Sequence, residues 1–349
     1  MKKITAIILS FVLCVFVVVT SSACSNNPAS NGQSNAAQKS NSNNFANANK
    51  PVIGIAWNPN RNDAFYLNWE FVIQEAGGIP VNLEQIKSYD INYDVHNYVE
   101  NNELDTKGEI KSEYAEKIKN HKYDNSNIDY VLAGIDGIFM PGGEDISSSL
   151  IDSSDVENNL SSGASATRDV SDYLLMTYCI DKDIPTFGVC RGMQMMSVAC
   201  GASIVDDIPK YCKDNNIVYD YAHRLNAEGS VIDFVRHNVD VKDKNSKFGQ
   251  IVNNDVFQNV PSLHHQGILD VDNTKLKEVG SYTSNGLKLV EAVEMPDKTF
   301  IMGTQFHPEY TVQQVKLRKQ TDPCDVDTCL KFFQQLVKYS AQKSGIVLK

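Results

Sequence analysis

The chain is short of positive charge. Of its 349 residues, 32 are lysine or arginine and 43 are aspartate or glutamate, so the net charge is −11. Proteins that bind nucleic acid or an anionic membrane surface usually carry the opposite excess. The composition therefore argues against nucleic acid as a partner, although it does not identify a substrate.

Cysteine spacings typical of metal or redox sites are also lacking. Cys14 and Cys24 lie in the N-terminal segment, and no two of the other six cysteines form a CxxC motif. These six are Cys179, Cys190, Cys200, Cys212, Cys324 and Cys329. We expect most of them to be buried thiols, with disulfide pairing left open. Cys324 and Cys329 are expected to point to different sides of the chain.

Only one hydrophobic run is long, and it stands at the N-terminus. Two lysines precede an apolar stretch over residues 4–19, and small residues lead to Cys24. This order is typical of an export signal over residues 1–23, and the stretch is short for a membrane span. Cys24 resembles the lipidated cysteine of a bacterial lipoprotein. The sequence therefore predicts an exported lipoprotein facing outside the cell membrane, or a secreted protein if Cys24 is not lipidated.

A polar tether is predicted after the signal, and a single domain after the tether. Asn, Ser and Ala dominate residues 24–50, which cannot bury enough apolar surface to offset their ordering entropy. Residues 51–345 then alternate between strand and helix patterns. This alternation predicts an α/β fold with a doubly wound, mostly parallel sheet.

The expected strands and helices are spread over the whole domain. Strands are expected at 51–57, 79–83, 135–140, 184–190, 232–241, 288–294 and 299–306, and helices at 62–76, 168–181, 191–201 and 328–341. Residues 87–129 break the rhythm and form a polar insertion, which is either a lid or a disordered excursion. A helix is expected over 109–119 within it.

Cys190 stands at an expected turn between strand and helix. Gly188 and Gly192 flank it in FGVCRGM, so the chain can turn sharply at the carboxyl end of a parallel strand. This is the pattern of a nucleophile elbow with cysteine in the place of serine. The amide of Arg191 would be a natural donor to an oxyanion at this turn. A buried and inert thiol is the competing interpretation.

A thiol nucleophile needs a base, and GTQFHPEY offers one. His307 and Glu309 are two residues apart, so on an extended strand both would face the same way. The carboxylate could then orient the imidazole. In PGGEDI, Gly143 is a candidate for a second oxyanion donor.

Two adjacent histidines, His264 and His265, precede Gln266. Adjacent side chains point apart and no matching carboxylate spacing accompanies them, so no metal site is expected there. A loop that contacts substrate is the favoured interpretation.

Four motifs in this order, PGGEDI, GVCRGMQ, HHQG and QFHPE, resemble the class I glutamine amidotransferase-like superfamily. GVCRGMQ is most similar to its γ-glutamyl hydrolase branch, the cysteine peptidases of family C26 that include γ-glutamyl-γ-aminobutyrate hydrolases. The chain departs from that branch at Pro261, where asparagine is usual, and in the 87–129 insertion.

The resemblance implies a cysteine hydrolase that cleaves γ-glutamyl amide bonds through a thioester, with no cofactor. It implies that Cys190 is the nucleophile, His307 the base and Glu309 its orienter. The implied oxyanion donors are Gly143 and Arg191, and the implied substrate contacts are Gln194, His264, His265 and Gln266.

Other functions stay open at this stage. They are an inactive, surface-tethered binding protein of the same fold, a glutaminase of the amidotransferase type, and an exopeptidase or esterase. The expected partners are a small γ-glutamyl substrate and, through a lipid anchor, the membrane. The oligomeric state is open, a homodimer included.

Overall fold

The computed structural model describes residues 49–59, 63–151, 163–224 and 234–348. The expected signal segment, Cys24 and residues 25–48 of the expected tether lie outside these ranges. Within them, no helix combines the length and the apolar character that crossing a bilayer requires.

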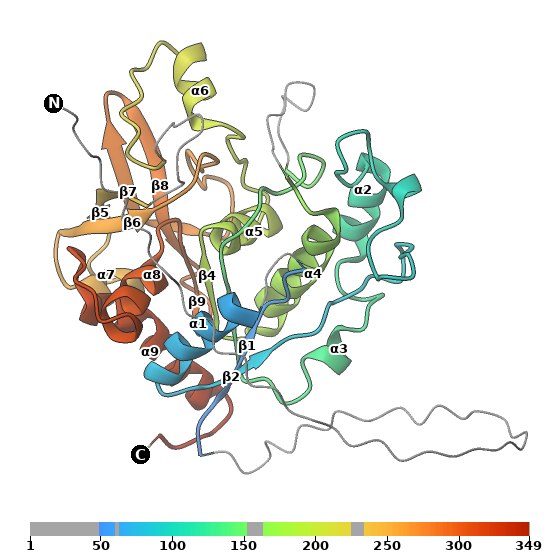
Figure 1. Ribbon diagram of the computed structural model, residues 1–349, viewed down its shortest axis with the longest axis horizontal. Coiled ribbons are helices and arrows are strands. Elements are labelled where there is room, and N and C mark those ends of the chain that lie inside the picture. Colours follow the sequence, from blue (N-terminus) through green and yellow to red (C-terminus); the bar gives the residue numbers. More distant parts are fainter. Residues whose placement is uncertain (1–48, 60–62, 152–162, 225–233, 349) are drawn as a thin grey trace, which may run out of the picture. The chain divides into compact units, whose positions relative to one another are not determined.

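A nine-stranded sheet forms the centre of the fold, in the order β2-β1-β3-β4-β9-β8-β7-β5-β6 (Figure 1). The strands are β1 (Val52–Ile55), β2 (Ile79–Asn82), β3 (Gly137–Met140), β4 (Thr186–Val189), β5 (Val235–Val241), β6 (Val256–Ser262), β7 (Lys277–Ser284), β8 (Leu287–Glu294) and β9 (Ile301–Thr304). The five strands from β2 to β9 pair in parallel, and β8, β7, β5 and β6 extend the sheet with antiparallel pairs.

Helices cover both faces of the parallel strands. The helices and helical turns are α1 (Asp63–Glu75), η1 (Asn101–Glu103), α2 (Ser112–His121), α3 (Ile128–Val131), α4 (Ala166–Lys182), α5 (Arg191–Ala199), α6 (Ile208–Asp214), α7 (Lys247–Val252), α8 (Pro308–Val312), η3 (Gln313–Leu317) and α9 (Val326–Lys343). Successive residues of a strand face opposite sides. Accordingly Phe139 packs in a core with α1 and α9, whereas Met140 packs in a core with α4 and α5.

The α/β class and the mostly parallel central sheet predicted from the sequence are confirmed by this arrangement. The strands β6 and β7 and the short helices α6, α7 and α8 were not expected. Polar residues alternate irregularly in β6 and β7, and Pro261 stands inside β6. These strands belong to the antiparallel extension, where a weaker apolar pattern suffices because they are less deeply buried.

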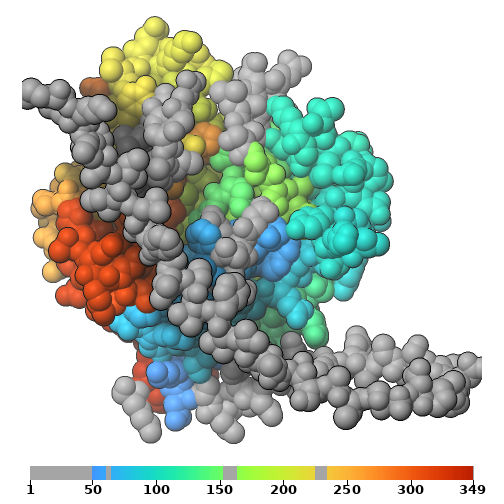
Figure 2. Space-filling view, in the orientation of Figure 1, coloured from blue at the N-terminus to red at the C-terminus, as the bar shows by residue number. Residues whose placement is uncertain are grey.

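Residues 87–129 fold against α4 rather than forming a disordered excursion. The expected helix is present as α2, shifted to Ser112–His121. Apolar residues of the segment, such as Ile91 and Ile118, join the core that also holds α4 and α5. The Val99 amide donates to Thr167 Oγ1 on α4 at 2.9 Å. Figure 2 shows the segment as one continuous lobe. No described residue of this lobe lines the cavities around Cys190.

The expectation that Cys324 and Cys329 point apart is wrong. Both thiols are buried, and their sulfur atoms lie 3.5 Å from each other. Cys329 stands in the first turns of α9, whereas Cys324 lies in the segment before that helix. The chain turns at the N-cap residue Asp325, and this turn brings the two side chains to one side.

Candidate active site

A strained turn places Cys190 at the carboxyl end of β4. Its backbone has φ 52° and ψ −107°, a conformation that costs free energy for any residue with a Cβ. The neighbouring glycines make the turn possible. A Cβ on Gly188 would lie 2.7 Å from the carbonyl carbon of Gly192, and one on Gly192 would lie 2.3 Å from the Met140 carbonyl oxygen. The geometry is that of a nucleophile elbow.

His307 and Glu309 form a close pair, although not on a strand. β9 ends at Thr304, His307 is the N-cap of α8, and Glu309 lies in the first turn of that helix. The expectation of an extended strand here is therefore wrong. Pro308 occupies the first helical position, where its missing N–H costs nothing. His307 Nδ1 still lies 2.7 Å from Glu309 Oε1.

The imidazole of His307 and the thiol of Cys190 lie beside the same glycine. A Cβ on Gly142 would stand 2.8 Å from His307 Cε1 and 3.3 Å from Cys190 Cβ. Burial alone would lower the pKa of His307, but charge on Glu309 and Cys190 raises it to about 10. Nε2 of His307 makes no well-aligned hydrogen bond to a described group. This nitrogen is thus available to exchange a proton near Cys190.

The loop after β3 is held by a buried arginine. Arg168 of α4 donates to the carbonyl oxygens of Pro141 at 3.1 Å and Gly142 at 3.2 Å, and to Glu144 at 2.6 Å. In a planar trans peptide the C=O and N–H point in opposite directions. The amide of Gly143 therefore points away from Arg168. Gly143 also lines both cavities at Cys190, so its amide remains a candidate oxyanion donor.

A second buried arginine ties the same loop to the elbow. The side chain of Arg191 donates to Asp169 at 2.7 Å and Asp172 at 3.1 Å, and to the carbonyl oxygens of Glu144 and Asp145. Its own amide opens α5 and has no partner within the helix. Arg191 thus positions the loop with its side chain, while its backbone amide stands next to Cys190 at the first position of α5.

Electrostatics in the loop are dominated by these two arginines. Burial would raise the pKa of Glu144, but Arg168 and, less strongly, Arg191 hold it at about 2. Both guanidinium groups are fully buried. Buried charges are tolerated only when they are paired and hydrogen-bonded, and these are.

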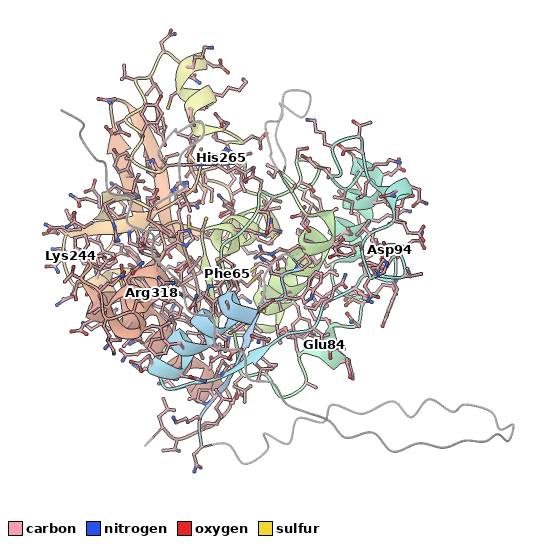
Figure 3. All side chains as sticks on the ribbon, viewed as in Figure 1. Phe65, Glu84, Asp94, Lys244, His265 and Arg318 are labelled. Carbon is pink, nitrogen blue, oxygen red and sulfur yellow. The ribbon has the colours of Figure 1, made fainter. Side chains whose placement is uncertain are left out.

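Two cavities meet at Cys190, Gly143 and Leu263. The larger, of about 290 Å³, contains His307 and Glu309. Four aromatic side chains line it, Phe65, Trp69, Phe234 and Tyr310, so we call it the aromatic cavity; the exposed Arg318 also lines it. Figure 3 labels Phe65, at the beginning of α1, and Arg318, which both line this cavity.

The smaller cavity, of about 220 Å³, is polar. Its lining includes Gln194, Arg224, Asp145 and the three residues His264, His265 and Gln266. His265 lies between two carboxylates, 2.9 Å from Asp145 and 3.2 Å from Asp207. Burial would lower the pKa of His265, but these carboxylates raise it.

The expected substrate contacts therefore share one cavity, but they are not equally available. Gln194 donates to the Gln266 carbonyl and to Gln305, both at 3.3 Å. The side-chain amide of Gln266 is buried, and neither its nitrogen nor its oxygen has a hydrogen-bond partner among the described groups. His264 turns inward, with Nδ1 2.8 Å from the Gln266 carbonyl and Nε2 3.7 Å from Glu291.

Sequence reasoning missed several residues that line these cavities. Arg224 lies outside every expected helix and strand, so no periodicity marked it. Phe65 and Trp69 are one helical turn apart on α1, a spacing that the sequence does show. Arg318 follows η3 and comes close only because the chain turns there.

The histidine pair does not converge on one point, since His265 faces Asp145 and His264 faces Glu291. His264 instead belongs to a buried group with His223, His237 and Glu291 that could hold a metal ion. From the sequence no metal site was expected, either at the histidine pair or elsewhere in the chain.

Comparison with known proteins agrees with these motifs. The sequence model of the family Peptidase C26 matches residues 117–309, which include Cys190, His307 and Glu309. A glutamine amidotransferase-like protein of Rickettsia prowazekii is 28% identical over 217 residues, covering 54% of this chain and 75% of that protein. The γ-glutamyl-γ-aminobutyrate hydrolase of Escherichia coli O157:H7 is 29% identical over 197 residues, covering 56% of this chain and 72% of that enzyme.

Among solved structures, the glutaminase domain of Trypanosoma brucei CTPS with bound acivicin matches at 18% identity and a TM-score of 0.46, over 83% of this chain and 94% of that chain. The family match spans more than half of the 349 residues and contains the elbow and the histidine–carboxylate pair. The chain belongs to the peptidase C26 family.

Proposed function

We propose that the protein is a cysteine hydrolase of γ-glutamyl amide bonds. Membership of the peptidase C26 family and the similarity to γ-glutamyl-γ-aminobutyrate hydrolase support a hydrolase of this kind. The observation that carries the proposal is geometric. Cys190 stands on a strained elbow in the same cavity as the hydrogen-bonded pair His307–Glu309.

In the first half of the proposed reaction, Cys190 gives its proton to His307 Nε2, and the thiolate attacks the γ-carbonyl carbon. The amides of Gly143 and Arg191 stabilise the oxyanion. His307 then protonates the departing amine, the C–N bond breaks, and a γ-glutamyl thioester remains on the sulfur. Glu309 holds the imidazole in one orientation throughout.

In the second half, His307 accepts a proton from water while the water oxygen attacks the thioester carbon. The C–S bond breaks, glutamate is released, and the proton returns to the sulfur. No oxidant, reductant or cofactor takes part. Loss of any one of these groups should remove most of the rate, because they act as a unit.

The two cavities suggest where each part of the substrate binds. His307 protonates the leaving amine and lies in the aromatic cavity, so the amine belongs there. The γ-glutamyl group then occupies the polar cavity, where Arg224 and Asp145 can pair with its α-carboxylate and α-amino groups. Arg318, which also lines the aromatic cavity, favours leaving amines that carry a carboxylate.

A glutaminase of the amidotransferase type is the second candidate, and the amidotransferase-like relative favours it. Its leaving group would be ammonia, which needs far less room than the aromatic cavity of about 290 Å³ provides. The size of this cavity therefore supports a larger amine.

The test is release of glutamate from a panel of γ-glutamyl compounds with aliphatic, aromatic and carboxylate-bearing amines, beside glutamine and muropeptides. We expect turnover of γ-glutamyl amines to exceed that of glutamine. Cys190→Ala should abolish it, while the matched control Cys200→Ser keeps it, since Cys200 lines neither cavity. Turnover retained by Cys190→Ala would reject the assignment, and turnover of glutamine alone would favour the glutaminase.

We also propose that the protein is exported and anchored through a lipid on Cys24. The support is the sequence of residues 1–24. Cys24→Ser should shift the protein from the membrane fraction to the soluble exported fraction. A protein found in the cytoplasm would contradict the proposal.

A further inference from the structure

Four buried residues that carry no step of the proposed reaction converge beside the polar cavity, and one of them, His264, also lines it. His237 comes from β5, Glu291 from β8, His264 from the loop after β6 and His223 from the segment before β5. We call them the histidine cluster. One ring nitrogen or carboxylate oxygen from each lies within 4.8 Å of every other.

Six side-chain atoms of the histidine cluster lack hydrogen-bond partners among the described groups. Both ring nitrogens of His223, Nε2 of His237 and of His264, and both oxygens of Glu291 make no hydrogen bond to a described group. His223 and Glu291 are fully buried, and the side chains of His237 and His264 are each 2% exposed. Buried polar groups in native proteins are almost always satisfied, so six open atoms at one point indicate a missing ligand.

The orientation of two histidines fits metal binding in particular. Nδ1 of His237 lies 3.1 Å from the Asn238 carbonyl oxygen, and Nδ1 of His264 lies 2.8 Å from the Gln266 carbonyl oxygen. A carbonyl can only accept, so each Nδ1 carries the proton and each Nε2 keeps its lone pair. Both lone pairs face Glu291. Histidine ligands of metals are usually fixed by such a second hydrogen bond.

The distances from the Glu291 carboxylate to the three imidazoles are close to those of a tetrahedral site, and all four ligand atoms lie within 4.8 Å of one another. Glu291 Oε1 lies 3.3 Å from His223 Nε2 and 3.7 Å from His264 Nε2, and Oε2 lies 3.6 Å from His237 Nε2. Four ligands at 2.0–2.1 Å from a zinc ion stand roughly 3.3–3.4 Å apart. Small shifts of side chains would therefore close the site.

We propose that His223, His237, His264 and Glu291 bind a divalent transition-metal ion, of which Zn²⁺ fits best. Imidazole and carboxylate ligands suit zinc, and four protein ligands without an open position are typical of a structural site. The rings of His223 and His237 also pack against Tyr282, at 4.6 and 5.1 Å between centroids, which keeps water away.

The metal would fix loops that carry the polar cavity. His223 directly precedes Arg224, which lines the cavity at Cys190. His264 lines it as well, between Leu263 and His265. The His264 amide also donates to the His223 carbonyl at 3.0 Å, so the two loops already touch. Because the metal ion would also be bound by His237 of β5 and Glu291 of β8, it would hold both loops against the sheet. The ion would thus position the γ-glutamyl pocket without touching the substrate.

The first test measures metal content. The untagged full-length protein is expressed with added Zn²⁺, dialysed, and analysed by mass spectrometry of its metals. We expect one Zn²⁺ per chain. Chelator treatment should remove the ion and lower Tm, and added Zn²⁺ should restore both. Tetrahedral visible absorption after Co²⁺ substitution would identify the coordination.

Variants then place the ion. Mutation of a residue that only hydrogen-bonds a metal ligand already lowers metal affinity roughly 10–100-fold. Loss of a ligand itself, as in Glu291→Gln or His237→Gln, should therefore lower Zn²⁺ affinity at least that much. His96→Gln is the matched control, because His96 is exposed and lies outside the cluster. If one variant fails to fold, the other variant and the wild-type metal content still decide the question.

Two results would overturn the proposal. One is wild-type protein that holds no more than trace metal and shows no Tm response to Zn²⁺, which would mean that water alone fills the cluster. The other is Zn²⁺ binding that His96→Gln weakens as much as Glu291→Gln does. Neither result bears on Cys190, because both readouts are independent of hydrolysis.

Discussion

Two groups of buried polar side chains flank the candidate active site, and they differ in how completely they are paired. In the first, Arg168, Arg191, Asp169 and Asp172 bring two guanidinium groups to two carboxylates, with contacts from 2.7 to 3.2 Å. In the second, the histidine cluster, six ring and carboxylate atoms face one another without a hydrogen bond. Both lie out of contact with bulk water.

The difference shows two ways to hold a catalytic loop. In the arginine group each guanidinium is paired with carboxylates of the protein, although Arg168 Nε and Asp172 Oδ1 make no hydrogen bond to a described group. The group fixes the loop around Gly143 by direct hydrogen bonds. The histidine cluster is as deeply buried as the arginine group, but six of its ring and carboxylate atoms make no hydrogen bond to a described group. We infer that it is completed from outside the chain.

The largest expected effect on stability comes from removing one arginine of the arginine group. Arg168→Met removes the main partner of Glu144 and one of the two arginines that pair with Asp172, and removal of one member of a buried ion pair costs about 3–5 kcal/mol. Denaturant unfolding measures this. Lys288→Met is the control, since its pair with Glu278 is half exposed and should contribute about 0–1 kcal/mol. Equal losses of unfolding free energy in the two variants would mean that the buried arginine group is no more important for stability than an exposed ion pair.

A second prediction concerns the loop that the arginines hold. A Cβ on Gly143 would lie 1.8 Å from Arg168 Nη1, and that guanidinium is fixed by its own hydrogen bonds. Gly143→Ala should displace the amide and lower kcat roughly 10²–10³-fold, as loss of one oxyanion donor does. Steady-state kinetics test this. A change confined to KM would argue against an oxyanion role.

The pair His307–Glu309 is hydrogen-bonded more completely than the histidine cluster and less completely than the arginine group. Nδ1 of His307 is bonded to Glu309, whereas Nε2 makes no hydrogen bond to a described group. Glu309→Gln should remove a charge-assisted hydrogen bond worth about 1.5–3 kcal/mol. The pKa of His307 is raised to about 10, so this stabilisation is full below the ordinary histidine pKa and fades as pH rises towards 10. Unfolding measured from pH 6 to 10 should show wild type and variant converging. A constant difference would contradict the assigned pair.

The smallest effect is expected in the histidine cluster once metal is removed. In chelator-treated protein, Glu291→Met replaces an unsatisfied carboxylate by an apolar group and should change stability by less than about 1 kcal/mol, or even increase it. The same substitution compared with zinc-loaded wild type should be clearly destabilising. A large loss already in the metal-free state would mean that the protein satisfies the cluster by itself.

The sequence alone was sufficient for the elbow and not for the histidine cluster. Gly188 and Gly192 around Cys190 mark a sharp turn locally, so this turn could be predicted from neighbouring residues. His307 and Glu309 were paired correctly, but on the wrong local structure. Pro308 is compatible with a strand end and with the first position of a helix, and only tertiary packing decides between them.

Other features depended on contacts between distant residues. His223 and Glu291 are far apart in the sequence, and no spacing rule connects them. The rejection of a metal at His264 and His265 considered only the adjacent pair. The insertion looked polar because its apolar residues, such as Ile91, Val99 and Ile110, are sparse, yet each is buried against the domain.

The most direct test of the account is labelling by a glutamine-like electrophile, followed by peptide mapping. Cys200 is an internal reference, because burial raises the pKa of its thiol to about 11 and keeps it protonated at neutral pH. We predict a single adduct on Cys190 that is lost in His307→Ala and blocked by a γ-glutamyl substrate. Labelling that spares Cys190, or that spreads equally over Cys190 and Cys200, would contradict the proposed chemistry.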